Sequence, residues 1–389
     1  MSPLTRRSLL RVGSGTLAAA ALAPSVSGCS ASADQSTVLA RPEPTRSPAL
    51  PAFDPDAPAG RPAGLPSRIA WANTSDVGIF AALGAGMRTA GEDAGLEYLT
   101  ANAEGDPQRN ADQIRTFLAR GIAGMTIQPL NPAAQQPLMQ EALDRGVCVV
   151  GIINHPCTIQ VAARQYDIGL QQGRAAARYI VEELGGRATV FNANLNEIAP
   201  QLELRNQGVL AGLEEAGDGV EVIDTYVSSG DQTPERVFAL ITTELQRHPE
   251  IKVVLGVDGF VLPAYRAFQQ TGRLTDDMYF ASIDGAPEVL ELVGQGGPYR
   301  AAHAFAWSLM GYGMGRFVAD WAAGRPVPRA MVAEATLVDS PAKARRFLAD
   351  AAAPRATFED RERYGTYLPL LGNVRFEDAD LHWTDEYQP

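Results

Sequence analysis

The stretch that decides the fold is "RIAWANTSDVGIFAALGAGMRTAGEDAGLEYLTAN", residues 68–102. It opens with a short apolar run, continues with a segment whose apolar residues recur at helical spacing up to Gly95, and ends with a second short run. Short strands separated by an amphipathic helix that stops at glycine are typical of a strand–helix–strand unit with parallel strands.

The same alternation continues to about residue 326. The further expected helices are 108–121, 132–146, 169–186, 199–217, 233–249, 260–272, 285–296 and 307–326, and the further expected strands are 122–130, 147–153, 187–194, 220–229, 251–258, 277–284 and 299–306. A second series therefore begins near Tyr166. The pattern predicts an α/β protein with two doubly wound parallel-sheet lobes joined end to end.

The N-terminus has the layout of an export signal. Three arginines precede an apolar run from Val12 to Ala23, which is too short for a stable membrane span, and small residues lead to Cys29. "TRRSLLR" resembles a twin-arginine signal, and "VSGC" resembles a lipoprotein processing site. We expect a signal peptide over 1–28 and lipidation of Cys29; an ordinary apolar terminus with a chance cysteine is the alternative. Residues 29–66, rich in proline, serine and alanine, predict a disordered tether.

Composition excludes several classes of protein. The net charge of −12 becomes −15 once the three signal arginines are removed, which argues against nucleic acid as a partner. Beyond the signal, no run approaches the length of a membrane span. Cys148 and Cys157 remain in an oxidising compartment; a disulfide is possible, and two separate thiols are favoured.

From Arg68 to Val338 the chain resembles the ribose- and galactose-type periplasmic sugar-binding proteins, which share their fold with the effector domains of lactose-type repressors. The resemblance rests on the order and spacing of several stretches. They are "RIAWANTSDVGIFAALGAGM", "GVCVVGIIN", "DIGLQQGRAAARYIVEELGG", "LELRNQGVLAGLEEAG", "VVLGVDGFVLPAYRAF" and "YFASIDGAPEVLELV". It implies the type I periplasmic binding protein fold, in which two lobes joined by three crossings close on a small polyhydroxylated ligand.

The resemblance also implies the domain boundaries. The crossings are expected near Arg164–Tyr166, Ala304–Trp307 and Pro326–Pro328. Lobe one then comprises 67–165 plus 306–327, and lobe two 166–305 plus 328–345. Residues 346–389 have no counterpart in the family, and their aromatic residues suggest an extension packed on the body.

The ligand-binding positions that the resemblance implies lie just after strands, where sugar hydroxyls would meet carboxylate, amide and guanidinium groups and where apolar faces would stack on the ring. The predicted ligand-binding residues are Asp76, Ile79, Phe80, Asn154, His155, Glu203, Arg205, Gln232, Asp258, Asp284 and Phe305. Glu203 stands where the family often has arginine, and Gln232 where ribose binders have an aromatic residue. No particular sugar is therefore predicted.

Several of these residues have a plainer interpretation. Asp76 and Asp258 are each followed by an expected helix and are equally suited to cap it. Phe80 would also serve as core, His155 as a loop residue, and Arg205 as a brace for its helix. These alternatives stay open on sequence alone.

An enzyme is the less favoured alternative. No histidine, cysteine and glutamate set has metal-ligand spacing, and no nucleophile elbow or P-loop occurs. "GYGMGRF" (311–317) superficially resembles a nucleotide loop, but it lies inside an apolar helical run, which favours close helix packing. We expect no cofactor, no metal and no catalytic residue, and the absence of DNA-binding helices together with the export signal excludes a transcription factor.

The predicted function is that of an extracytoplasmic solute-binding lipoprotein. It would capture a sugar or polyol by hinge closure and deliver it to an ABC transporter permease, as a monomer held to the outer face of the cell membrane by its lipid. A lipid-tethered receptor that reports to a membrane sensor would bind its ligand in the same way, so this alternative remains open.

Overall fold

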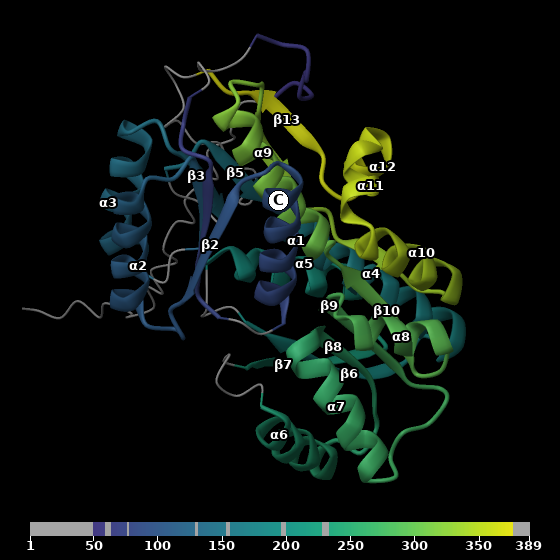
Figure 1. Ribbon diagram of the computed structural model, residues 1–389. Coiled ribbons are helices and arrows are strands. Elements are labelled where there is room, and N and C mark those ends of the chain that lie inside the picture. Colours follow the sequence, from purple (N-terminus) through teal and green to yellow (C-terminus); the bar gives the residue numbers. More distant parts are fainter. Residues whose placement is uncertain are drawn as a thin grey trace, which may run out of the picture. The chain divides into compact units, whose positions relative to one another are not determined.

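The computed structural model describes residues 50–58, 64–75, 78–128, 131–152, 156–195, 200–227 and 233–375. Among these residues, strands form two separate sheets, and each sheet has helices on both faces (Figure 1). All strand pairs are parallel except those of two edge strands, β12 and β13. The α/β fold class predicted from the sequence is confirmed.

The first sheet has seven strands, which belong to lobe one. In spatial order they are β13 (Leu370–Asn373), β11 (Pro328–Val332), β5 (Ile159–Ala162), β4 (Cys148–Ile152), β3 (Gly124–Ile127), β1 (Arg68–Asn73) and β2 (Glu97–Asn102). Its helices are α1 (Ile79–Asp93), α2 (Pro107–Arg120), α3 (Pro132–Asp144) and α9 (Trp307–Ala322). Successive residues of β1 point to opposite faces, so that Ile69 packs with α1 and α9 while Ala70 packs with α2 and α3.

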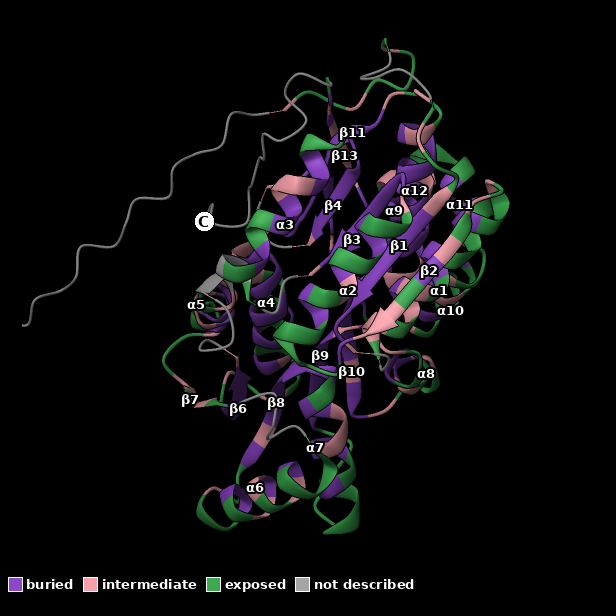
Figure 2. Cartoon of the chain, turned by 60° about the vertical axis from the view of Figure 1, so that its left-hand side comes forward, coloured by how far each residue is buried: buried purple, intermediate pink, exposed green. Residues whose placement is uncertain are grey.

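The second sheet has six strands, which belong to lobe two. In spatial order they are β12 (Thr336–Val338), β10 (Tyr299–Ala304), β9 (Tyr279–Asp284), β8 (Ile251–Val257), β6 (Ala188–Asn194) and β7 (Val220–Tyr226). Its helices are α4 (Gln165–Glu183), α5 (Pro200–Glu214), α6 (Pro234–Arg247), α7 (Asp258–Gln270) and α8 (Pro287–Gln295). Figure 2 shows the strands largely buried and the outward helix faces exposed, as amphipathic helices on a buried parallel sheet require.

Glycines let paired helices approach closely. A Cβ atom added to Gly311 of α9 would lie 2.1 Å from the carbonyl oxygen of Leu83 in α1, and one added to Gly86 would lie 2.2 Å from the carbonyl oxygen of Ser308. The "GYGMGRF" run therefore forms the contact surface of a buried helix. The prediction that these glycines serve close helix packing is confirmed.

The third crossing lies later in the chain than expected. Pro328–Val332 forms β11, which pairs with β5 in the lobe-one sheet, whereas Thr336–Val338 forms β12 in the lobe-two sheet. The chain thus passes between lobes over residues 333–335. The expected assignment of 328–345 to lobe two does not hold for β11.

The C-terminal extension lies against both lobes. α10 (Pro341–Ala352) packs on α8, while α11 (Pro354–Glu359) packs on α9 and leads through α12 (Arg361–Gly365) to β13. β13 also meets a part of the predicted tether, because the backbone N–H of Gly372 donates to the carbonyl of Pro51 at 2.7 Å. This part of the tether is therefore attached to the folded body.

Candidate functional site

Two carboxylates stand at neighbouring strand ends in lobe two. Asp258 directly follows β8, and Asp284 is the last residue of β9; the two strands pair with Val257 opposite Ile283. Ligands of open parallel sheets bind beyond the carboxyl ends of the strands. This register therefore brings both predicted aspartates to one place.

Asp258 is 7% exposed and organises the turn beside it. Its carboxylate accepts hydrogen bonds from the Ser282 hydroxyl and from the backbone N–H of Ala286, the residue that precedes α8. Tyr299 in turn donates to the Ser282 hydroxyl at 2.7 Å. Among the described residues, no side-chain hydrogen bond caps the start of α7, and Asp258 instead braces the start of the neighbouring helix α8.

Asp284 is held in an unusual backbone conformation with φ at 117°, which non-glycine residues rarely adopt. Its carbonyl oxygen accepts two hydrogen bonds, from the backbone N–H of Phe305 at 3.1 Å and from the indole N–H of Trp307 at 2.8 Å. The next residue, Gly285, has φ at 80°, and an added Cβ would lie 2.4 Å from the Ala304 Cβ. The second crossing between lobes thereby fixes the backbone of Asp284, from which its carboxyl group extends.

The two carboxyl groups affect each other's ionisation. Burial raises the pKa of Asp258, and the nearby charge of Asp284 raises it further, against hydrogen bonds from Ser282, Ala286 and Gly285. Burial also raises the pKa of Asp284, while the Arg205 guanidinium acts in the opposite direction. Because both pKa values are raised, the pair can hold a proton near neutral pH and can donate as well as accept hydrogen bonds. Hydroxyl groups of a ligand, which also do both, suit such a pair.

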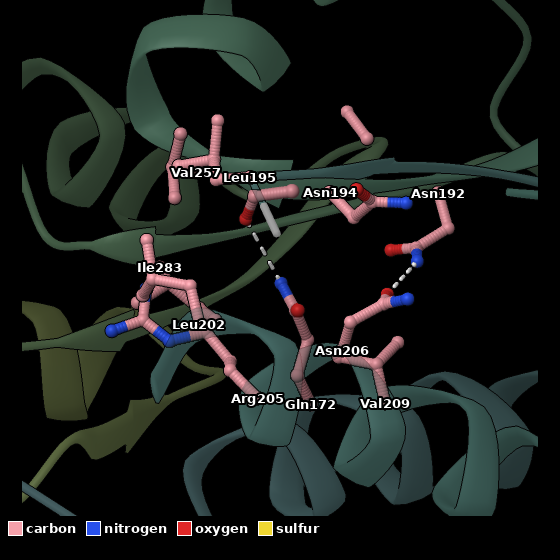
Figure 3. Close-up of a pocket in the computed structure, with 12 residues that line it drawn as sticks. Gln172, Asn192, Asn194, Leu195, Leu202, Arg205, Asn206, Val209, Val257 and Ile283 are labelled. Carbon is pink, nitrogen blue, oxygen red and sulfur yellow. Dashed lines mark hydrogen bonds between the residues drawn. The ribbon is translucent and has the colours of Figure 1, made fainter. Parts of the chain in front are cut away.

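Arg205 is the cation that faces this pair. It lies on α5, donates from Nε to the Gln165 side chain at 2.8 Å, and lines a small cavity of about 30 Å³ at the ends of the lobe-two strands. Figure 3 shows it on the side of that cavity opposite Asn192 and Asn206. The structure therefore gives Arg205 contact with the first crossing, through Gln165, and with the cavity.

A network of amides that the sequence analysis did not identify lies across the same cavity. Asn192 donates to Asn206 at 2.7 Å, and both amides donate to the Asp224 carboxylate, at 2.8 and 2.9 Å respectively. Asn194 donates to Asp224 as well, at 2.8 Å. The signal in the sequence was the alternation of asparagines in "FNAN" (191–194), which places both on one face of β6.

The aromatic residues of the second crossing lie next to Asp284. Phe305 is buried and its ring contacts that of Trp307, with centroids 5.0 Å apart. Trp307 is half-buried and lines the larger cavity described below, so it offers an apolar face that the sequence analysis did not select. On lobe one, Ile79 lines this cavity, whereas Phe80 packs against the apolar core.

Glu203 lies apart from these groups. Its side chain is exposed on α5 and accepts a hydrogen bond from Gln207 one turn later, at 3.0 Å. Two residues of helix turn a side chain by about 200°, so Arg205 faces the cavity and Glu203 faces solvent. Asp76, Asn154, His155, Gln232 and Cys29 lie outside the described residues.

A cavity of about 680 Å³ is lined by the two carboxylates and by residues of both lobes. Its lining includes Asp258 and Asp284, Ile79 and Trp307 from lobe one, and apolar side chains of α7, α8 and α10. A few polar groups in a mainly apolar cavity of this size are typical of small-molecule sites.

Across the described ranges, no group of three or more histidine, cysteine, aspartate or glutamate residues is arranged to hold a metal ion. In the same part of the chain, no helix is both long and apolar enough to span a membrane. Cys148 and Cys157 are buried free thiols in the structure.

Comparison with known proteins places the chain in a family. A model described as "periplasmic binding protein domain" matches residues 69–326. A D-ribose/D-allose-binding protein of Pseudomonas aeruginosa is 27% identical over 181 residues, which cover 45% of this chain and 57% of that protein.

Two solved structures share the fold at low sequence identity. A twin-arginine translocation pathway signal protein from Burkholderia phytofirmans is 20% identical with a TM-score of 0.64, covering 79% of this chain and 98% of its own. An ABC transporter solute-binding protein from Bacillus halodurans with bound myo-inositol is 18% identical with a TM-score of 0.61, covering 74% and 99%. The two lobes, their crossings and the match over most of the folded body together show that this chain belongs to the periplasmic binding protein domain family.

Proposed function

We propose that this protein captures a polyhydroxylated small molecule, a sugar or polyol, between its lobes and delivers it to an ABC transporter permease. The observation that carries the proposal is the Asp258–Asp284 pair at adjacent strand ends, next to the Trp307 ring and in one cavity with lobe-one residues. Carboxylate acceptors bind hydroxyl donors, and an aromatic face packs on the C–H surface of a sugar ring. The family is one of binding proteins rather than enzymes.

The names of relatives support this ligand class. The similar proteins include one named for ribose and allose and one solved with myo-inositol, which are all polyhydroxylated and uncharged. An apolar ligand has no hydrogen-bonding groups and would leave the carboxyl groups of Asp258 and Asp284 unpaired. A ligand with several hydroxyl groups would form hydrogen bonds with them.

The proposed mechanism is closure of two lobes about their crossings. Arg164, at the first crossing, forms an ion pair with Glu334, at the third, with 3.1 Å between Nη1 and Oε1. This pair links two of the connecting segments, while the Asp284 carbonyl is bonded to the second crossing. A ligand that contacts both lobes would favour the closed state because only that state makes all the contacts.

The proposed location is the outer face of the membrane. The basic and apolar segments before Cys29 support export, and a similar structure is named as a twin-arginine pathway protein. We further propose that Cys29 carries the lipid. Replacement of Cys29 by serine is expected to move the protein from the membrane fraction to the soluble fraction; unchanged fractionation would exclude this anchor.

A thermal-shift screen tests the ligand class. The chain with Cys29→Ser is mixed with sugars, polyols, sugar acids and nucleosides, and a ligand at a hundredfold excess over its Kd is expected to add about 2.7 kcal/mol of stability. Asp284→Asn should reduce the shift strongly, whereas the matched control Glu203→Gln, on the exposed face of α5, should preserve it. A screen in which only nucleosides or sugar acids bind would refute the sugar and polyol class.

A further inference from the structure

The C-terminal extension contributes a wall to the ligand cavity. The family match ends at residue 326, whereas Phe347 and Leu348 of α10 line the same cavity as Asp258 and Asp284. α10 lies beside α8 (Figure 1), and Phe347 of α10 belongs to the same apolar cluster as Leu290 of α8. The wall is thus made by a segment outside the matched family domain.

The wall is fixed in place by polar contacts. The Ser308 hydroxyl of α9 donates to the carbonyl of Ala351 at 2.8 Å. Asp350 is 1% exposed, and its carboxylate accepts from the Tyr367 hydroxyl and pairs with Arg363. The Phe347 ring also packs edge-on against the Tyr367 ring at 5.5 Å. These contacts, to α9 and to the residues that follow α11, hold α10 beside the cavity.

The lining of the cavity combines two kinds of surface. Asp258 and Asp284 lie at the strand ends, and apolar side chains of the helices line the cavity as well: Leu262 and Pro263 of α7, Leu290 of α8 and Leu348 of α10. Leu262 lies about one helical turn beyond Asp258 on α7. A ligand hydroxyl group placed against these apolar side chains would lose its hydrogen bonds to water without replacing them, which weakens binding. The volume of about 680 Å³ lies within the range of sites that bind drug-sized ligands.

We propose that these apolar side chains form a subsite beside the carboxylates, and that the natural ligand is a sugar or polyol carrying an alkyl or aryl substituent. This inference rests on the proposed function of the Asp258–Asp284 pair. The polar part of the ligand binds at Asp258 and Asp284, and its substituent lies along Leu262, Leu290 and Leu348. The extension therefore acts as a specificity element, because it supplies one side of the subsite.

Paired ligands test the subsite by isothermal titration calorimetry on the chain with Cys29→Ser. The probes are ribose, glucose, galactose and myo-inositol, each alone and as its butyl glycoside or butyl ether. In at least one pair the butyl member should bind more tightly, by up to about fourfold for each buried methylene group. Equal or weaker binding of every butyl member would overturn the subsite and leave the proposed function in place.

Two matched variants locate the effect. Ala352 lines the cavity and is exposed, so Ala352→Trp should fill the subsite and remove the gain from the butyl group while the unsubstituted member still binds. Ala349 is also exposed on α10, and Ala349→Trp should keep the gain. A gain that survives Ala352→Trp would overturn the placement. If no probe of either kind binds, the sugar and polyol function is overturned, and the subsite with it.

Discussion

Replacing Gly169 by alanine should destabilise the protein through a single added methyl group. Gly169 lies on α4 where that helix crosses α5, and a Cβ atom there would be 1.9 Å from the carbonyl oxygen of Arg205. The same atom would be 2.9 Å from the backbone nitrogen of Val209. Both neighbours are backbone atoms, so no side-chain rotation can relieve the clash.

The magnitude follows from the distance. Ordinary van der Waals contact begins at 3.4 Å, whereas the added Cβ atom would lie 1.9 Å from the Arg205 carbonyl oxygen. The helices α4 and α5 must therefore move apart by about 1.5 Å at this point. Overpacking costs about 1–3 kcal/mol, and alanine regains up to about 1 kcal/mol over glycine in a helix. With a shift of this size we expect a net loss of about 2 kcal/mol in the free energy of unfolding.

Urea unfolding measures the effect. At a slope of about 3 kcal/mol per molar urea, a loss of 2 kcal/mol lowers the midpoint by about 0.7 M. Gly294 of α8 is the matched control, because an added Cβ would meet only the Ala344 Cβ at 3.6 Å, an ordinary contact. Gly294→Ala should therefore raise the midpoint slightly. A Gly169→Ala protein as stable as the parent, beside a control that behaves as expected, would refute the packing argument.

The remaining predictions concern the site and the thiols. In the unliganded protein, burial raises the pKa of Asp284 to about 6, and burial together with the charge of Asp284 raises the pKa of Asp258 to about 8, both from 3.8. The folded state then holds protons that the unfolded state has lost. The stability due to this pair should therefore fall as pH rises from about 4 to 8, and Asp284→Asn should flatten that dependence in urea midpoints; an unchanged slope contradicts the coupling. Trp307→Phe removes the indole N–H that donates to the Asp284 carbonyl. The substitution should lower the free energy of unfolding by about 1 kcal/mol and weaken ligand affinity. If neither value changes, this hydrogen bond does not hold Asp284 in place. Cys148 and Cys157 are buried, and burial raises the pKa of Cys157 to about 12. Neither thiol should therefore react with a disulfide reagent at pH 8 before the protein unfolds. The measurement uses the chain with Cys29→Ser, and rapid labelling of its folded state would disprove the burial of both thiols.

Local sequence predicted the elements well because their signals are local. Apolar residues at spacing two or 3.6 reveal which face of a strand or helix is buried, and this information needs no knowledge of the neighbours. The glycines of 311–317 were interpreted correctly for the same reason, since they interrupt neither the apolar run nor the helical spacing. Asp258 and Asp284 could be selected as candidates because the sequence pattern places each of them at the end of a strand.

Which distant segments pair with each other was decided by the tertiary structure. β11 and β12 are short strands only a few residues apart, and nothing local indicates that they pair with different sheets, β5 and β10 respectively. The role of Asp258 as a brace also depends on Ser282, a residue of the neighbouring strand. Pairing of this kind depends on surfaces that exist only after the strands have assembled.

The sequence by itself determined that this chain is an α/β protein of two lobes with acidic groups at its strand ends. Only the tertiary structure decided that Arg205 rather than Glu203 faces those groups, that Trp307 joins them, and that α10 covers one side of their cavity. Helix rotation and long-range packing set these relations. A one-dimensional pattern records which residues are buried, but it does not record which distant residues they are buried against.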